Sequence, residues 1–235
     1  MTKPILKQPS LARRLKSSVH ELQRNAGRLF KGPTSGMRTD LTANGVPVLF
    51  IHNPRTGGRS LESFFNVRRL SHAFPIERLA ARHWEENFVV TSIRHPVDRF
   101  FSGYFGFIRS SSKNSLVKLY GWEVKKLSPL EYLELISNHP RHIGPQVQWT
   151  DFPSPNKPRA DLVLRFEEIA TWEEAMVSAG IVIRDRRMPH IGKSGNRENL
   201  GIGDLGITEE EFRLLQTRLL EYYNSDFEAF GYRIK

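Results

Sequence analysis

The stretch from Val46 to Phe65, VPVLFIHNPRTGGRSLESFF, constrains the fold of this chain more than any other. Its apolar run up to Ile51 is long enough for a buried strand but too short for a buried helix, and Pro54 marks the end of that strand. A helical pattern then resumes, which Ser60 can cap. A strand, a glycine-containing turn and a helix N-terminus together present free backbone N–H groups at the positive end of a helix dipole. We therefore expect a phosphate or sulfate site in this stretch.

The same strand–turn–helix pattern recurs along the chain. A β-branched apolar run predicts a strand over 88–93, and Pro96 then suits the first turn of a helix. Further strands are predicted over 67–70, 161–164 and 181–183, and further helices are predicted over 75–81 and after capping boxes at 128–131, 171–174 and 208–211. Residues 110–127 have weak periodicity and read as a surface excursion or lid.

This alternation predicts a single P-loop-like α/β domain with a central parallel sheet of about four to five strands flanked by helices. In such sheets ligands bind beyond the carboxyl ends of the strands. The polar segments 53–60, 71–72 and 94–95 follow three predicted strands, so we expect them to meet at one cleft.

The net charge of +10 is concentrated at the N-terminus. Residues 1–40 hold nine basic and two acidic side chains, which leaves +3 for residues 41–235. We therefore expect a basic N-terminal arm and linker over 1–42, a folded domain over 43–235, and no nucleic-acid partner. Leucines at near-helical spacing in the arm permit an amphipathic helix with weak contact to an anionic membrane surface, and a partly ordered extension is the alternative.

The chain has no cysteine, so disulfides and thiolate metal sites are not available to it. The longest apolar runs are far too short to span a bilayer, and the first residues lack the pattern of a secretory signal. We therefore expect a soluble, cytoplasmic protein.

The turn formed by residues 54–60, which we call the 54–60 loop, lacks the GxxxxGK[ST] spacing of nucleotide triphosphatases. We expect it to hold one phosphate or sulfate, with charge from Arg55 and Arg59. An ordinary tight turn is the alternative interpretation.

A second candidate anion site lies in the segment 93–104, IRHPVDRFFSGY. Arg94, at the end of a strand, can donate forked charge-assisted hydrogen bonds, and Ser102, on the following helix, can add its hydroxyl group. Taken singly, the arginine suits a surface ion pair and the serine suits close helix packing. Next to the first site, the pair indicates a second anion site.

These motifs resemble those of sulfotransferases. PRTGGRS from Pro54 resembles their 5′-phosphosulfate loop, and the segment 93–104 resembles their 3′-phosphate motif. Pro145-Gln146, LRFEEI from Leu164, PHIGKS from Pro189 and the closing YYNSDFEAFGY extend the resemblance to the branch that contains Golgi carbohydrate sulfotransferases and their bacterial relatives. The resemblance covers roughly residues 46–235. In the family pattern Arg55 replaces a lysine, Arg59 a small hydroxyl residue and His95 an aspartate.

The resemblance implies transfer of a sulfuryl group from 3′-phosphoadenosine-5′-phosphosulfate (PAPS) to a hydroxyl of a carbohydrate or similar acceptor by in-line displacement, without a metal ion. It assigns PAPS binding to Pro54, Arg55, Thr56, Gly57, Gly58, Arg59, Ser60, Arg94, Ser102, Lys193 and Arg197. Catalysis is assigned to Arg55 and to His72. His72 is the candidate base because it follows the second predicted strand and should face the cleft, although a histidine that only caps the next helix fits as well.

Two other functions fit parts of the sequence. A nucleotide-dependent kinase has the same architecture, but the missing GK[ST] and the lack of an obvious Mg²⁺ carboxylate disfavour it. A protein that binds nucleic acid or membrane through residues 1–40 would use the domain only as a scaffold.

Overall fold

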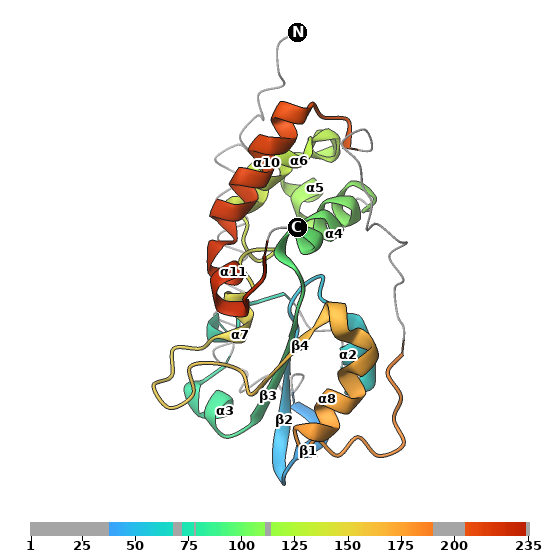
Figure 1. Ribbon diagram of the computed structural model, residues 1–235, viewed down its shortest axis with the longest axis vertical. Coiled ribbons are helices and arrows are strands. Elements are labelled where there is room, and N and C mark those ends of the chain that lie inside the picture. Colours follow the sequence, from blue (N-terminus) through green and yellow to red (C-terminus); the bar gives the residue numbers. More distant parts are fainter. Residues whose placement is uncertain (1–37, 68–71, 78, 111–113, 190–204, 234–235) are drawn as a thin grey trace.

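The computed structural model describes residues 38–67, 72–77, 79–110, 114–189 and 205–233. They form an α/β fold with a four-stranded sheet of order β1-β2-β3-β4 and helices on both of its faces (Figure 1). The strands are β1 (Arg38–Ala43), β2 (Val46–Ile51), β3 (Phe88–Ile93) and β4 (Leu162–Arg165). The α/β class is thus confirmed.

The sheet is mixed, which corrects the expected parallel sheet. β2, β3 and β4 are parallel, whereas β1 pairs with β2 in the antiparallel sense through a tight turn at Asn44 and Gly45. Both turn residues have positive φ, as the mirror-image turns of hairpins require. β1 begins at Arg38, inside the segment expected to be a linker, because its polar pattern RTDLTA carries little strand signal.

The helices form two groups. α2 (Gly58–Phe64) and α8 (Trp172–Ser178) lie on one face of the sheet, and α3 (Ala81–Glu85) and α7 (Val147–Thr150) on the other (Figure 1). Beyond the sheet lie α4 (Pro96–Ile108), α5 (Ser115–Tyr120), α6 (Pro129–Ser137) and α10 (Glu209–Tyr222), with α11 (Asn224–Phe230) between the groups. Short 3₁₀ turns span η1 (Pro75–Glu77), η2 (Trp122–Lys126) and η3 (Phe166–Thr171).

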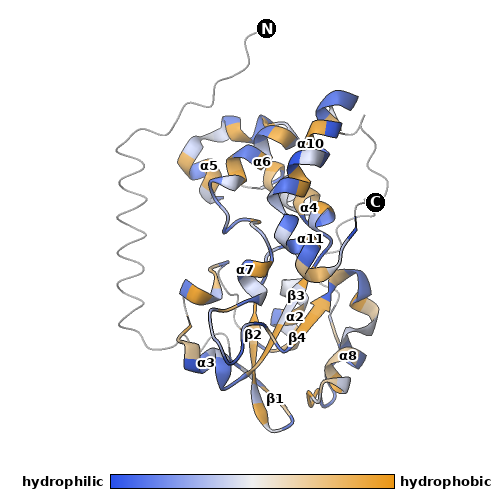
Figure 2. Ribbon diagram, turned by 60° about the vertical axis from the view of Figure 1, so that its left-hand side comes forward, coloured by the Kyte–Doolittle hydropathy of each residue, from blue (hydrophilic) through white to orange (hydrophobic). Residues whose placement is uncertain are grey.

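The core follows from the two-residue period of β2. Val48 and Phe50 join a cluster with α2 and α8, while Leu49 and Ile51 join a second cluster around Trp84 on the opposite face. The third cluster holds the helical layer together, with Phe100, Tyr132 and Leu219 among its buried members. Figure 2 shows hydrophobic colour along β2 and β4. Among the described residues, the helices are all too short or too polar to cross a membrane.

Several elements match their predictions. β3 spans 88–93 as expected, α4 begins at Pro96, and capping boxes at Ser128 and Thr208 start α6 and α10. The fourth strand is shifted by one residue from its predicted 161–164.

Other local predictions were wrong. α2 begins at Gly58 after a left-handed Gly57, so Ser60 lies inside the helix and does not cap it. The box at 171–174 does not form, because the Thr171 hydroxyl donates to Glu168 O (3.0 Å) at the end of η3. The predicted helix over 75–81 divides into η1 and a later α3, and the predicted strand 181–183 is one isolated bridge between Ala43 and Ile181.

The predicted lid over 110–127 is, from residue 114 onward, part of the helical layer. α5 and η2 bury Leu116, Val117 and Val124 in the core. Each element is only five or six residues long, so its hydrophobic period is too short to read from sequence. The predicted strand over 67–70 falls largely on residues outside the described ranges.

Candidate functional site

The 54–60 loop is a packed turn with two residues in left-handed conformation. Arg55 has φ +69° and Gly57 has φ +82°. The left-handed conformation costs a non-glycine residue roughly 1–2 kcal/mol, so surrounding contacts must hold Arg55 in place. A side chain at Gly57 would have its Cβ 2.8 Å from Trp172, and one at Gly58 would have its Cβ 2.8 Å from the His52 ring. Neither position can therefore accept a larger residue unless a neighbouring side chain shifts.

Four consecutive backbone N–H groups of the loop have no hydrogen-bond acceptor among the described residues. Those of Thr56, Gly57, Gly58 and Arg59 donate to no group in the part of the chain that the structure describes, whereas those of Ser60 and Leu61 donate to Gly57 O (2.9 and 3.4 Å). A run of N–H groups around left-handed residues makes an anion-binding concavity. Since α2 has only seven residues, these amides matter more than its dipole.

The hydroxyl groups of the loop face inward. Thr56 is fully buried, and its Oγ1 donates to Asn53 O (2.8 Å) and lies 2.7 Å from Ser92 Oγ. Ser60 is also buried. The hydroxyl of Thr56 therefore fastens the loop to β3, and Thr56 can offer an anion only its amide.

Arg55 and Arg59 are both exposed. Arg55 extends to α4, because a Cβ placed on Gly106 would lie 1.2 Å from the Nη2 of Arg55. Gly106 thus provides the room for this guanidinium, and Ser102 lies one turn earlier on the same face of α4. The predicted Arg55 and Ser102 therefore share one side of the molecule.

Arg94 follows β3, and its guanidinium carbon lies 4.4 Å from the centre of the Phe166 ring. Burial lowers the pKa of Arg94, while the charges of Asp98 and Glu167 oppose that shift. Neither the Arg94 guanidinium nor the Ser102 hydroxyl makes a hydrogen bond to another described residue. The same Phe166 ring would be 3.1 Å from a Cβ at Gly57, so it joins the two predicted anion elements.

His72 is exposed, and its ring centre lies 5.2 Å from that of His52. His52 is buried and pairs through Nδ1 with Glu62 Oε1 at 2.8 Å. The candidate base therefore lies beside the residues that precede the 54–60 loop. By contrast, His95 is tied into the fold, since its backbone N–H donates to Glu167 Oε1 (2.6 Å) and its Nε2 donates to Arg233 O (2.9 Å).

Sequence reasoning missed the buried polar cluster beneath the loop. Arg99 is completely buried and donates to Pro54 O, Asn53 Oδ1, Ile143 O and Gly144 O. Burial lowers the pKa of Arg99, and nearby Tyr223 and Asp226 oppose the shift. The sequence feature that could have indicated this cluster is Arg99 itself, a charged residue next to apolar residues on the helix that follows β3.

Gln146 and Asp226 complete this cluster. Gln146 accepts from the Arg94 N–H and donates to Arg94 O, both at 2.8 Å, and so fixes the backbone at the end of β3. Asp226 accepts from Gln146 Nε2 (3.2 Å) and from the Val147 N–H (3.1 Å). Burial raises the pKa of Asp226, and the charge of Arg99 opposes that rise.

Lys193 and Arg197 lie outside the described residues. Within the described ranges, no group of three or more His, Asp or Glu side chains is arranged to hold a metal ion.

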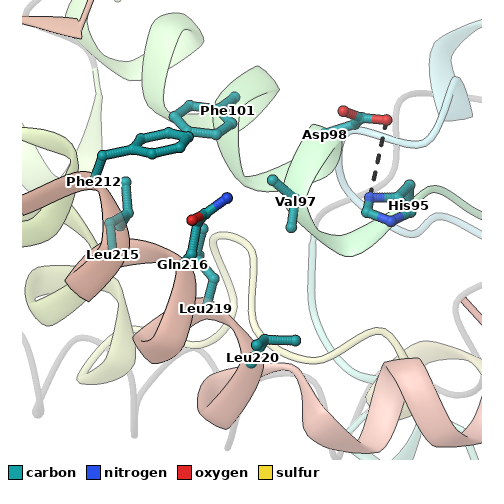
Figure 3. A pocket seen from close by; sticks show the side chains of 9 residues that line it. All are labelled: His95, Val97, Asp98, Phe101, Phe212, Leu215, Gln216, Leu219 and Leu220. Atoms are coloured by element: carbon teal, nitrogen blue, oxygen red, sulfur yellow. Dashed lines mark ion pairs between the residues drawn. The ribbon is translucent and has the colours of Figure 1, made fainter. Parts of the chain in front are cut away.

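A mostly apolar groove of about 90 Å³ lies between α4 and α10 (Figure 3). It is lined by His95, Val97, Asp98, Phe101, Phe212, Leu215, Gln216, Leu219 and Leu220. Val97 and Phe101 occupy a different face of α4 from Ser102 and Gly106. The groove therefore opens on a different face of α4 from Ser102 and Gly106, although Asp98 in its lining also acts on the charge of Arg94.

Comparisons with protein-family models, with curated proteins and with solved structures each found no match. A functional assignment therefore depends on the loop geometry and on the two motifs.

Proposed function

We propose that this chain is a sulfotransferase that transfers the sulfuryl group of PAPS to a hydroxyl of a carbohydrate or similar acceptor. The observation that carries the proposal is the meeting of two anion-binding elements at one aromatic ring: Phe166 contacts both the Arg94 guanidinium and the space above Gly57. PAPS carries anionic groups on both its 5′ and 3′ positions and so needs two such elements. The resemblance of both motifs to those of sulfotransferases supports the same class.

In this proposal the 54–60 loop holds the 5′-phosphosulfate through the unpaired amides of residues 56–59, with Pro54 and Ser60 as its ends. Arg55 and Arg59 add positive charge, and the exposed Arg55 is the group that neutralises the leaving phosphate. Arg94 and Ser102 hold the 3′-phosphate. Lys193 and Arg197 complete the nucleotide site, as the resemblance implies.

The transfer would be a single displacement. The acceptor oxygen forms a bond to sulfur while the bond from sulfur to the phosphate oxygen breaks, and the nucleotide bisphosphate leaves. His72 takes the proton of the acceptor hydroxyl. Positive side chains and backbone amides supply the charge stabilisation, so we propose no metal requirement. Any contact of residues 1–40 with an anionic membrane surface would be weak and separate from this chemistry.

The test is a set of thermal unfolding measurements on the full chain with 3′-phosphoadenosine-5′-phosphate (PAP), ATP and DNA, followed by transfer assays with labelled PAPS and a panel of glycans and simple alcohols. We expect PAP to raise the unfolding temperature, because a ligand that binds only the folded state stabilises it. A rise in unfolding temperature with ATP instead would favour the kinase alternative, and a rise with DNA would favour binding of nucleic acid through residues 1–40. Absence of any shift with PAP would refute the proposal.

Two variants assign the roles. Arg55→Ala should abolish transfer, whereas His72→Ala should lower turnover and leave PAP affinity nearly unchanged, since a base does not contact the nucleotide. Turnover at the unchanged rate in His72→Ala would place the base elsewhere.

A further inference from the structure

Arg99 connects the helical layer to the 54–60 loop from below. Its Nε donates to Pro54 O at 2.9 Å, and its Nη2 donates to Asn53 Oδ1 at 3.0 Å. On the other side, its Nη1 donates to Gly144 O at 2.7 Å and to Ile143 O at 3.3 Å. One rigid guanidinium therefore spans from the loop to the segment that precedes α7.

The charge of Arg99 is not neutralised by a contacting carboxylate in the described part of the chain. All four of its acceptors are carbonyl oxygens, and Asp226 is occupied by Gln146 and the Val147 N–H. Burying a charge is costly, and here the cost is offset by hydrogen bonds to four carbonyl oxygens rather than by a contacting counter-ion. The guanidinium is therefore the donor on which the carbonyl oxygens of both the loop and the segment before α7 depend.

The contact with Pro54 O determines how the next peptide faces. In a planar trans peptide the C=O and the following N–H point in opposite directions. Because Arg99 draws Pro54 O into the core, the Arg55 N–H is directed away from the core. The same contact acts on the residue that leads into Arg55, whose left-handed backbone must be held by its surroundings.

We infer that Arg99 is a positioning residue that holds the 54–60 loop in its anion-binding conformation. It acts through Pro54 and Asn53, and its buried positive charge lies behind the loop, where it favours an anion in front. The expectation that Arg99 supports PAPS binding rests on the proposed function. The expectation that Arg99 holds the loop conformation does not depend on it.

The first test is limited trypsin digestion of the full chain, with the cut sites identified by mass spectrometry. Arg55 and Arg59 are exposed and are themselves trypsin sites, so cleavage after them reports opening of the loop. In Arg99→Lys the charge remains, but a single ammonium cannot bridge Pro54 O and Gly144 O as the fork does. We expect cleavage after Arg55 and Arg59 to be at least about tenfold faster than in the unmodified chain.

Tyr223→Phe is the matched control. Tyr223 is as buried as Arg99, and its hydroxyl donates to Ile143 O at 2.6 Å, an acceptor that Arg99 also uses, but it makes no hydrogen bond to the described residues of the loop. All variants are digested at equal distance below their own unfolding temperatures. We expect cleavage in the control to stay within about twofold of the unmodified chain. Arg99→Met removes the charge as well, so cleavage after Arg55 and Arg59 should be faster in it than in Arg99→Lys. If the Met variant does not fold, the Lys variant alone decides the question.

The second test separates positioning from simple structural support through kinetics. In Arg99→Lys we expect the KM for PAPS and the dissociation constant for PAP to rise about tenfold, with the KM for the acceptor unchanged. Loss of folded protein alone would lower the apparent kcat and leave both KM values as they were.

Equal cleavage rates in Arg99→Lys and Tyr223→Phe would overturn the inference, as would a donor KM that does not change. If the unmodified chain fails to bind PAP, the proposed function fails, and the digestion experiment still decides the role of Arg99.

Discussion

At the residue scale, two glycines with nearly the same backbone conformation distinguish the cost of a left-handed backbone from the cost of a steric clash. Gly45 in the β1–β2 turn has φ +84° and no atom within 4 Å of an added Cβ, whereas Gly57 has φ +82° and Trp172 at 2.8 Å. Gly45→Ala should cost about 1–2 kcal/mol of unfolding free energy from the left-handed conformation alone. Gly57→Ala should cost about 1–3 kcal/mol more, because the core cannot admit the methyl group without shifting Trp172.

Urea unfolding of both variants measures these costs, and PAP binding shows whether the loop survives. Equal losses for the two glycines would mean that Trp172 yields and that the loop is not fixed by its packing. PAP affinity should fall only in Gly57→Ala, since Gly45 lies at the far end of β2.

Arg94 provides a second residue-scale prediction. Arg94→Ala should weaken PAP binding by about tenfold or more, since a charge-assisted contact contributes roughly 1.5–3 kcal/mol. The unfolding free energy should change little, because the guanidinium makes no hydrogen bond to another described residue. Isothermal titration with PAP measures the affinity. Arg159→Ala is the control, because it removes another arginine near an aromatic ring, 5.9 Å from Phe230, and should leave PAP affinity intact. Unchanged affinity in Arg94→Ala would move the 3′-phosphate elsewhere.

Short motifs next to strand ends can be recognised in the sequence, whereas residues that are joined to those motifs only through packing cannot. Gly57, Arg94 and Ser102 belong to the turn or the helix that directly follows a predicted strand, so the local pattern singles them out as candidates. Arg99 is joined to Pro54 in the loop, and Gln146 to Arg94 just after β3, by contacts across 45 and 52 positions of sequence, which no local pattern reports. The resemblance included both residues, but it gave them no role.

At the element scale, the capping boxes show how tertiary context decides between equal sequence signals. Ser128 and Thr171 each precede a glutamate at the third helical position. At Ser128 the reciprocal bonds form, with the Glu131 N–H donating to Ser128 Oγ (3.3 Å) and the Ser128 N–H donating to Glu131 Oε2 (2.9 Å). At Thr171 the chain is already turning in η3, so no free helix end is left to cap.

The same pair gives an element-scale prediction. Ser128→Ala should destabilise the fold by about 1 kcal/mol through loss of the cap, whereas Thr171→Ala should cost only a few tenths. Thermal or urea unfolding of the two variants measures these costs. Equal losses would show that the Thr171 hydroxyl matters as much to α8 as the cap does to α6.

Parallel strands with buried residues were the easiest elements to predict. β2 and β3 are mostly apolar and buried, and the sequence predicted the end of β2 at Ile51 and both bounds of β3. β1 is an edge strand with polar side chains, and its place in the sheet depends on pairing with β2, which the residues 38–43 alone do not specify.

At the scale of the whole molecule, the charge is divided between two parts of the chain. Removing residues 1–37 lowers the net charge from +10 to +3, since eight basic and one acidic side chain lie there. The residues that form the sheet, the 54–60 loop and the Arg94 region all lie within 38–233. If the donor site belongs to the α/β fold alone, deletion of 1–37 should leave PAP affinity within about twofold. Binding to vesicles with anionic lipids should fall sharply, because each basic side chain near such a surface contributes about 1 kcal/mol.

Vesicle sedimentation at two salt concentrations, beside titration with PAP, measures both effects on the same preparations. Contact through the charge of residues 1–37 should weaken as salt rises from 0.05 to about 0.2 M, because surface electrostatics is screened over roughly 10 Å at 0.1 M. A deletion that weakens PAP binding would show that residues 1–37 contribute to the nucleotide site. The bounds of the functional unit would then have to extend to the N-terminus, because the excess positive charge would serve the anionic donor.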